Sequence, residues 1–272
     1  QRIETEGEEK VFSRSYLAWI YLPRSQLTKR RWPAPLCACV CAMGAVSVVL
    51  IILDDLRPEL PGVAYQCPHV VAPAMAKLAE ESVAFRRAYA QEALCAPSRN
   101  SFLSGRMPDE TRSWQFLDDF REVGDDWTSL PEAFKRAGYT AVGAGKVFHP
   151  GLPAYWDMPR SWDVRMNNSE WEPWLYPSEP RCANHTSWCA VSNSTDRDFE
   201  DTQTSNRLEE LLENVTDPYF LADGFRKPHL SWRFPVEFLQ DAGEVSLPSN
   251  VYAPVGSPGL SYHIPYEELS GL

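Results

Sequence analysis

The distribution of apolar residues predicts short buried strands that alternate with helices. Val48–Leu53 is a continuous, largely β-branched run that ends in two carboxylates, as expected of a strand buried on both faces. Similar runs predict strands over Val83–Tyr89, Tyr139–Val147 and Tyr219–Phe225. Capping residues and helical periodicity predict helices over Pro73–Ser82, Pro97–Leu103, Ser129–Ala137 and Thr204–Asn214. This alternation indicates an α/β domain with a mostly parallel sheet flanked by helices.

The chain before the first strand has a different pattern. Residues 1–35 are polar with basic patches, and an uncharged apolar run then extends from Leu36 to Leu53. Its first part, up to Val46, is rich in Ala, Cys and other small residues, as in the apolar core of a signal peptide. We therefore predict an N-terminal extension over residues 1–46 that includes a signal peptide. The alternative is a membrane span over Leu36–Leu53, which has the minimal length for one.

A long segment rich in Pro and Trp, Pro150–Pro180, shows no helical or strand periodicity. Its Trp side chains suit either of two roles, packing beneath the loop or forming a platform on which a sugar ring stacks. Packing is the more common role for Trp in long loops. These side chains are Trp156, Trp162, Trp171 and Trp174.

The net charge limits the classes of ligand. The 272 residues include 26 Lys and Arg against 37 Asp and Glu, which gives a formal net charge of −11. An acidic chain of this kind is not a general nucleic-acid binder, because such proteins need a basic surface to displace counterions from phosphates. A small anionic substrate remains compatible, because a few cations can dominate the field of one pocket.

Cysteines and glycosylation sequons point to an oxidising compartment. Cys182 and Cys189 enclose a short polar loop and form either a disulfide or two free thiols. Asn-x-Ser/Thr sequons follow one another within a short stretch on both sides of this pair. We expect a protein of the secretory pathway, lysosomal or extracellular, that is glycosylated at Asn167, Asn184, Asn193 and Asn214.

Asp54 and Asp55 follow the first predicted strand of the sheet directly. Ligands of open parallel sheets gather at the carboxyl ends of the strands. Two adjacent carboxylates there suit a hard cation such as Ca²⁺ or Mg²⁺, although an Asp-Asp helix cap or turn has the same sequence.

The segment Cys95–Arg106, with the sequence CAPSRNSFLSGR, is the most specific motif in the chain. It resembles the signature of the sulfatase family, C-x-P-S-R followed by Leu-x-Gly-Arg. The resemblance implies that Cys95 is oxidised to formylglycine by a formylglycine-generating enzyme. The hydrated aldehyde then offers one oxygen as nucleophile and a second hydroxyl whose deprotonation expels sulfate. The alternative is an ordinary buried cysteine before a helix.

Further stretches resemble the same family in the same order. VVLIILDDLRP, GKVFHP and FRKPH correspond to its metal-binding strand and two of its catalytic loops. The resemblance implies one Ca²⁺ held by Asp54, Asp55 and a formylglycine oxygen at Cys95. It implies catalytic roles for Cys95, Arg99, Lys146, His149 and His229, and contacts to the sulfate by Lys146, Lys227 and His229.

The resemblance also implies an alkaline-phosphatase-like α/β fold, of which residues 47–272 would be the incomplete N-terminal catalytic domain. The second metal-ligand pair and a second sulfate-binding Lys of the family have no counterpart in the 272 residues. Two local departures are Ala72–Ala76, in place of a polar S-P-N-x-D turn, and Asp223, in a strand that is apolar in the family.

The expected activity is hydrolysis of a sulfate monoester, with a sulfated uronic acid of a glycosaminoglycan as the substrate. We expect this truncated chain to be weakly active or inactive. The alternatives are another sulfatase, a phosphonate monoester hydrolase of the same superfamily, or a catalytically dead fragment that acts as a binding module.

Overall fold

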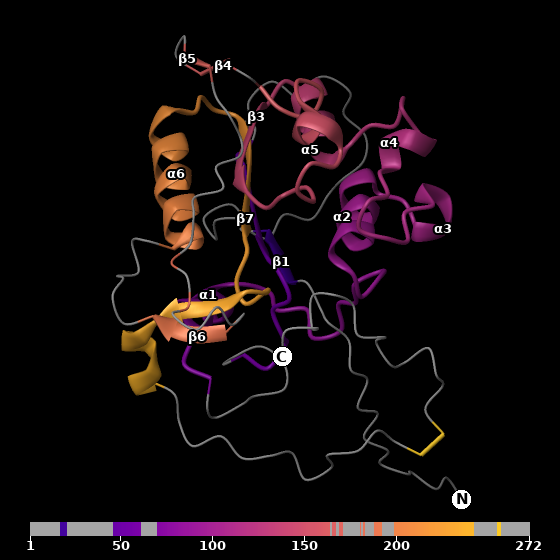
Figure 1. Ribbon diagram of the computed structural model, residues 1–272. Helices are drawn as coiled ribbons and strands as arrows, with labels where there is room; N and C mark the ends of the chain where they lie inside the picture. The colour runs from indigo at the N-terminus through magenta and orange to yellow at the C-terminus, as the bar shows by residue number, and fades with distance from the viewer. Residues whose placement is uncertain are drawn as a thin grey trace, which may run out of the picture.

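The computed structural model describes residues 46–60, 70–163 and 199–241, together with residues 17–20, 165–166, 169–170, 180, 182, 188–191 and 255–256. At its centre lies a sheet with the strand order β1-β2-β7-β3 (Figure 1). β2 (Val48–Leu53) and β3 (Thr140–Gly145) run parallel to β7 (Tyr219–Phe225), and β1 (Leu17–Ile20) runs antiparallel to β2. The predicted mostly parallel sheet is therefore confirmed, and β1 adds an edge strand that the sequence pattern did not predict.

The register of the three parallel strands places their carboxyl ends at one edge of the sheet. Leu53, the last residue of β2, pairs with Phe225, the last residue of β7. Gly145, the last residue of β3, pairs with Gly224. The segments that follow these strands therefore leave the sheet side by side, at the edge where parallel sheets bind ligands.

Helices cover both faces of the sheet (Figure 1). α6 (Glu200–Asn214) packs on β3 and β7 from one side, and α5 (Leu130–Arg136) packs on the same strands from the other. α2 (Cys95–Ser104) packs against α5 and ends at Gly105 in the left-handed conformation, as the sequence predicts for a glycine stop. The other elements are α1 (Pro73–Glu81), α3 (Pro108–Thr111), α4 (Phe120–Val123), β4 (Arg165–Met166), β5 (Ser169–Glu170), β6 (Trp188–Val191) and β8 (Trp232–Pro235), with 3-10 turns at Ala154–Asp157 and Val236–Asp241.

The main hydrophobic core lies between the sheet and these helices. Phe134 of α5 stacks on Phe220 of β7 with ring centroids 4.4 Å apart. Trp162 is buried in the same core, where it meets Phe148 edge to face. Its indole N–H donates to the carbonyl oxygen of Trp156 at 2.9 Å. Trp162 therefore packs beneath the Pro- and Trp-rich loop, whereas Trp171 and Trp174 lie outside the described residues.

The prediction of a strand over Val83–Tyr89 is wrong. This segment contains a turn at Arg86–Arg87, and no strand pairs with it in the described part of the chain. Val83, Phe85 and Tyr89 are 71%, 74% and 68% exposed. β-Propensity reflects packing against neighbouring strands, and the alternation of apolar residues does not reveal that such neighbours are missing here.

The second part of the apolar run Leu36–Leu53 is a strand, as its composition predicts. Val48–Leu53 forms β2, which lies between β1 and β7 in the sheet and is therefore not part of a membrane-spanning helix. Among the described residues, no helix has the length and apolar character needed to cross a membrane. Residues 21–45 lie outside the described residues.

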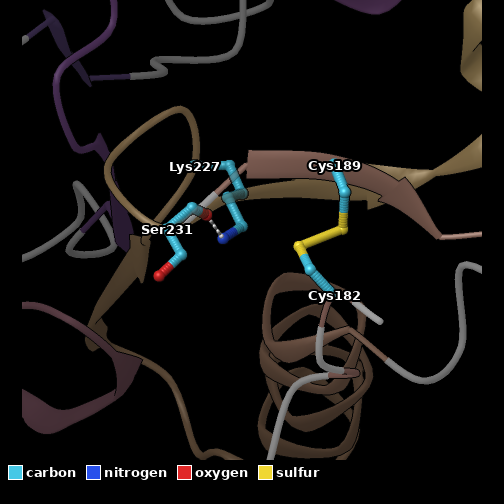
Figure 2. Close-up of a disulfide and its surroundings, with 4 residues drawn as sticks. All are labelled: Cys182, Cys189, Lys227 and Ser231. Atoms are coloured by element: carbon cyan, nitrogen blue, oxygen red, sulfur yellow. Dashed lines mark hydrogen bonds between the residues drawn. A yellow bond between two sulfur atoms is a disulfide. The ribbon is translucent and has the colours of Figure 1, made fainter. Parts of the chain in front are cut away.

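A small second sheet carries a disulfide. β6 pairs in parallel with β8, with Cys189 opposite Arg233. Cys182 and Cys189 are joined by a disulfide, with their Cα atoms 5.9 Å apart (Figure 2). Among the four sequons, Asn214 is exposed at the end of α6. The other three, Asn167, Asn184 and Asn193, lie outside the described residues.

The N-terminus of α5 has a complete capping box. Ser129 Oγ accepts the N–H of Glu132 at 3.2 Å, and the Glu132 carboxylate accepts the N–H of Ser129 at 3.3 Å. We expect Ser129→Ala to lower the free energy of unfolding by about 1–2 kcal/mol, measured by urea denaturation. Thr128→Ala, which removes the neighbouring hydroxyl near the surface, is the control. Equal losses in the two variants would contradict a specific capping role.

Candidate active site

The predicted site residues converge at the carboxyl edge of the sheet. Asp54 follows β2 directly, Lys146 follows β3 directly, and His229 lies in the loop after β7. Cys95 is the first residue of α2, and Arg99 lies one turn further along the same helix. The parallel register brings the strand ends together, so residues that are 175 positions apart in sequence reach one site.

Asp54 is the centre of a buried group of charges. Its carboxylate is fully buried and pairs with Arg99 Nη2 at 3.2 Å and with Lys146 Nζ. His229 Nε2 lies 4.0 Å from the same carboxylate. Burial alone would raise the pKa of Asp54, but the positive charges of Arg99 and Lys146 outweigh it and hold this pKa well below its usual range. Asp54 is therefore ionised across the physiological pH range.

Arg99 connects α2 to the loop that carries Lys146. Its guanidinium donates to the carbonyl oxygen of Val147 at 2.8 Å and to that of Lys146. The same loop crosses β7 at Gly224, where an added Cβ would lie 2.1 Å from the backbone carbonyl of Lys146. Only glycine fits here, and this close crossing places the Lys146 side chain over Asp54.

Cys95 is a buried free thiol at the N-terminus of α2. Burial raises the pKa of this thiol, and the negative charge of Asp54 adds to the effect, against the lowering influence of Lys146 and Arg99. An unmodified Cys95 is therefore protonated at neutral pH. Because the thiolate is the nucleophilic form, the cysteine as encoded is poorly suited to attack a substrate.

Both predicted histidines are neutral at physiological pH. Burial, followed by the charges of Lys146 and Arg99, lowers the pKa of His149 to about 4. Burial and Lys146 also lower the pKa of His229. The His229 Nδ1 atom lies 2.7 Å from the carbonyl oxygen of Leu230. A carbonyl only accepts, so Nδ1 carries the proton and Nε2 of the neutral ring is the free acceptor.

The described residues do not form a complete metal site. No group of three or more His, Cys, Asp or Glu side chains within the described ranges is arranged to hold a metal ion. The Asp54 oxygens instead face Arg99 and Lys146. Asp55 follows in the left-handed region with φ 61°. Ca²⁺ takes six to eight oxygens, which Asp54, Asp55 and residue 95 alone do not supply.

Comparison with known proteins identifies the family. The family model for sulfatases matches residues 47–245. This chain belongs to the sulfatase family. It is 35% identical to iduronate 2-sulfatase from Mus musculus over 244 residues, and 35% identical to that from Homo sapiens over 241 residues. These alignments cover 82% and 80% of this chain but 42% of each relative. A sulfatase from Formosa agariphila is 29% identical over 240 residues, which are 77% of this chain and 46% of that protein. The chain thus spans about two fifths of the length of these relatives.

Family membership confirms the predicted resemblance and the alkaline-phosphatase-like α/β fold. The sulfatase signature Cys95–Arg106 forms the whole of α2 with its glycine stop. Of the predicted site residues, the structure brings Asp54, Cys95, Arg99, Lys146, His149 and His229 into electrostatic contact with one another.

Lys227 has a different environment from the other predicted site residues. Its Nζ donates to the carbonyl oxygen of Ser231 at 2.6 Å, beside the disulfide-bearing strand β6 (Figure 2). Its backbone N–H donates to the Asp201 carboxylate at 2.8 Å. A contact between Lys227 and the sulfate therefore requires this side chain to leave Ser231.

The structure also shows a supporting residue that the motifs did not reveal. Asn100 follows Arg99 in α2, and its amide donates to Ser113 Oγ at 2.5 Å and to the carbonyl oxygen of Asp118 at 2.9 Å. It thereby fixes the loop that carries Phe116, whose ring lies 5.8 Å from the His149 ring. The only sequence signal for this role is that Asn100 lies within the signature segment.

Proposed function

We propose that this chain carries the nucleophile-bearing part of the active site of a sulfuric ester hydrolase. The observation that carries the proposal is the position of Cys95, at a helix N-terminus and in the field of Arg99 and Lys146. The two buried cations Arg99 and Lys146 act on Cys95 beside the buried carboxylate of Asp54, in a protein of net charge −11. Such a field suits the negative charge of a sulfate ester.

The proposed nucleophile derives from Cys95 by conversion to formylglycine. Its hydrate supplies an oxygen nucleophile and a route to release sulfate by elimination. The raised thiol pKa supports this, because the unmodified cysteine is protonated and inert at neutral pH. Modification requires a formylglycine-generating enzyme as a partner.

The surrounding side chains supply charge stabilisation, proton transfer and orientation of the hydrate. Arg99 and Lys146 stabilise the charge that develops on the transferring sulfuryl group. His229, when its ring is protonated, gives the Nε2 proton to the leaving oxygen, because its Nδ1–H is engaged with Leu230. His149 lies in the field of Lys146 and Arg99 and orients the hydrate as a neutral ring.

The proposal includes Ca²⁺ as the cofactor, with Asp54, Asp55 and an oxygen at position 95 among its ligands. The carboxylate chemistry of Asp54 and Asp55 suits this hard cation. Asp54 Oδ1 also accepts no hydrogen bond from the described residues, although it pairs with Arg99.

For the substrate we propose a sulfated uronic acid of a glycosaminoglycan. Support comes from the similarity to two proteins named iduronate 2-sulfatase. We also propose passage through the secretory pathway, to a lysosomal or extracellular destination. The Cys182–Cys189 disulfide and the exposed sequon residue Asn214 support an oxidising, glycosylating route.

Mass spectrometry tests the nucleophile directly. The 272-residue chain, secreted from cells that contain the formylglycine-generating enzyme, is digested with trypsin. We expect the peptide from Ala88 to Arg99 to have an aldehyde in place of the Cys95 thiol. An unmodified thiol in every peptide would overturn the nucleophile assignment.

Turnover of an aryl sulfate in the presence of Ca²⁺ tests the activity. We expect weak turnover that Cys95→Ala abolishes, because the variant has no side chain that can become an aldehyde. Turnover that persists unchanged in Cys95→Ala would contradict the proposal.

A further inference from the structure

The loop that carries His229 is held from outside the active site. It leaves the sheet at Arg226, directly after β7, and runs to Ser231, directly before β8. Within it, the N–H of His229 donates to the carbonyl oxygen of Arg226 at 2.9 Å. The position of the imidazole therefore depends on where Arg226 and Lys227 begin the loop.

Asp201, in the first turn of α6, fixes that beginning. One of its carboxylate oxygens accepts the N–H of Arg226 at 2.7 Å, and the other accepts the N–H of Lys227 at 2.8 Å. Two charge-assisted bonds to consecutive N–H groups determine both the position and the direction of the backbone. α6 itself packs on β3 and β7, so the carboxylate is presented from a rigid element.

Glu200 reinforces the same connection through the Arg226 side chain. Its buried carboxylate pairs with Arg226 Nη1 at 3.1 Å. Nε of the same guanidinium donates to the carbonyl oxygen of Leu230 at 3.2 Å, at the far end of the loop. Leu230 is also the acceptor for His229 Nδ1. The first turn of α6 is thus linked to both ends of the loop and to the imidazole.

An acidic residue in the first turn of a helix usually stabilises its own helix. In α6 the N-cap residue, Phe199, provides no side-chain cap. Asp201 nevertheless directs both oxygens to another segment of the chain. This use of the carboxylate indicates a role in the site and not only in the helix.

We propose that Asp201 is a positioning residue that holds the loop Arg226–Ser231 and thereby keeps His229 against Asp54. The inference rests on the proposed function, in which His229 Nε2 gives a proton to the leaving group. A displaced Nε2 would lower kcat by about 10- to 100-fold, since such losses follow misplacement of about 1 Å. The KM for an aryl sulfate should change much less, because Arg99 and Lys146 remain in place.

The test uses the complete 272-residue chain with ¹³C-labelled histidine rings. The sequence has five histidines, and the variants His229→Gln and His149→Gln identify the signals of His229 and His149. In Asp201→Asn we expect this signal to move or broaden while that of His149 is unchanged. Glu209→Gln removes an exposed carboxylate from the same helix and should leave both signals in place.

The outcomes separate this inference from the proposed function. An unchanged His229 signal in folded Asp201→Asn would overturn the positioning role, whatever the activity. Absence of turnover in the unaltered chain would bear on the proposed function alone, because the ring signal does not require catalysis. If Asp201→Asn does not fold, Asp201→Glu takes its place: it keeps the charge but moves the acceptor oxygens by one methylene. It should also move the His229 signal, and an unchanged signal there would equally overturn the inference.

Discussion

Asp54→Asn should lower the free energy of unfolding by about 3–5 kcal/mol, the usual cost of removing one partner from a buried ion pair. The wild-type carboxylate is fully buried between Arg99 and Lys146. Asparagine keeps its shape but removes its charge, so two buried cations lose their counterion. Denaturation by urea at pH 7 measures the loss.

The loss of stability should depend on where the neutralised carboxylate lies, and not only on the loss of one negative charge. Glu59→Gln neutralises an acid in the loop after β2, where Glu59 pairs with Arg57 at the surface. We expect it to cost less than about 1 kcal/mol, as surface ion pairs do. Adding Lys146→Met to Asp54→Asn should recover part of the loss, because it removes one uncompensated cation. A loss below about 1 kcal/mol in Asp54→Asn would show that the buried charges are not coupled in this way.

Much of the fold could be predicted from local patterns. Val48–Leu53 and Tyr219–Phe225 are strands with the predicted bounds, because each is a largely apolar run with a clear start and end. The end of α2 at Gly105 and the start of α5 at Ser129 could also be predicted, because a glycine stop and a serine cap act on residues close by in the sequence. The prediction of a strand over Val83–Tyr89 was wrong because strand formation depends on a neighbouring strand that is distant in sequence.

The candidate site shows the same division. The signature around Cys95 and the order of the later motifs identified the residues that converge on Asp54. Asp201 could not be found in this way, because an acid near a helix start has the same appearance whether it caps its helix or holds another loop. Lys227 shows the reverse case, since a motif names the residue but not the direction of its side chain.

The sequence also marked Asp223 as unusual, and the structure explains why it matters. Asp223 lies in β7, the central strand between Ile51 of β2 and Ala144 of β3. It is completely buried, and no side chain in the described ranges donates a hydrogen bond to either carboxyl oxygen. Burial raises the pKa of this carboxyl to about 8, and the negative charge of Asp201 acts in the same direction. Asp223 is therefore protonated in the folded protein at neutral pH.

A carboxyl whose pKa is raised on folding stabilises the protein fully only below the pKa of the unfolded chain. That stability is lost as the pH rises from about 4 towards 8, because the unfolded chain releases the proton while the folded protein retains it.

Asp223→Asn has no such proton to lose. We expect it to be more stable than the wild type by about 3–5 kcal/mol at pH 8 and by less than about 1 kcal/mol at pH 4.5, since each pKa unit corresponds to about 1.4 kcal/mol. Urea denaturation at pH 4.5, 6 and 8 measures this difference, with Glu213→Gln on the exposed surface of α6 as the control. A difference between Asp223→Asn and wild type that does not change with pH would show that Asp223 ionises normally in the folded protein.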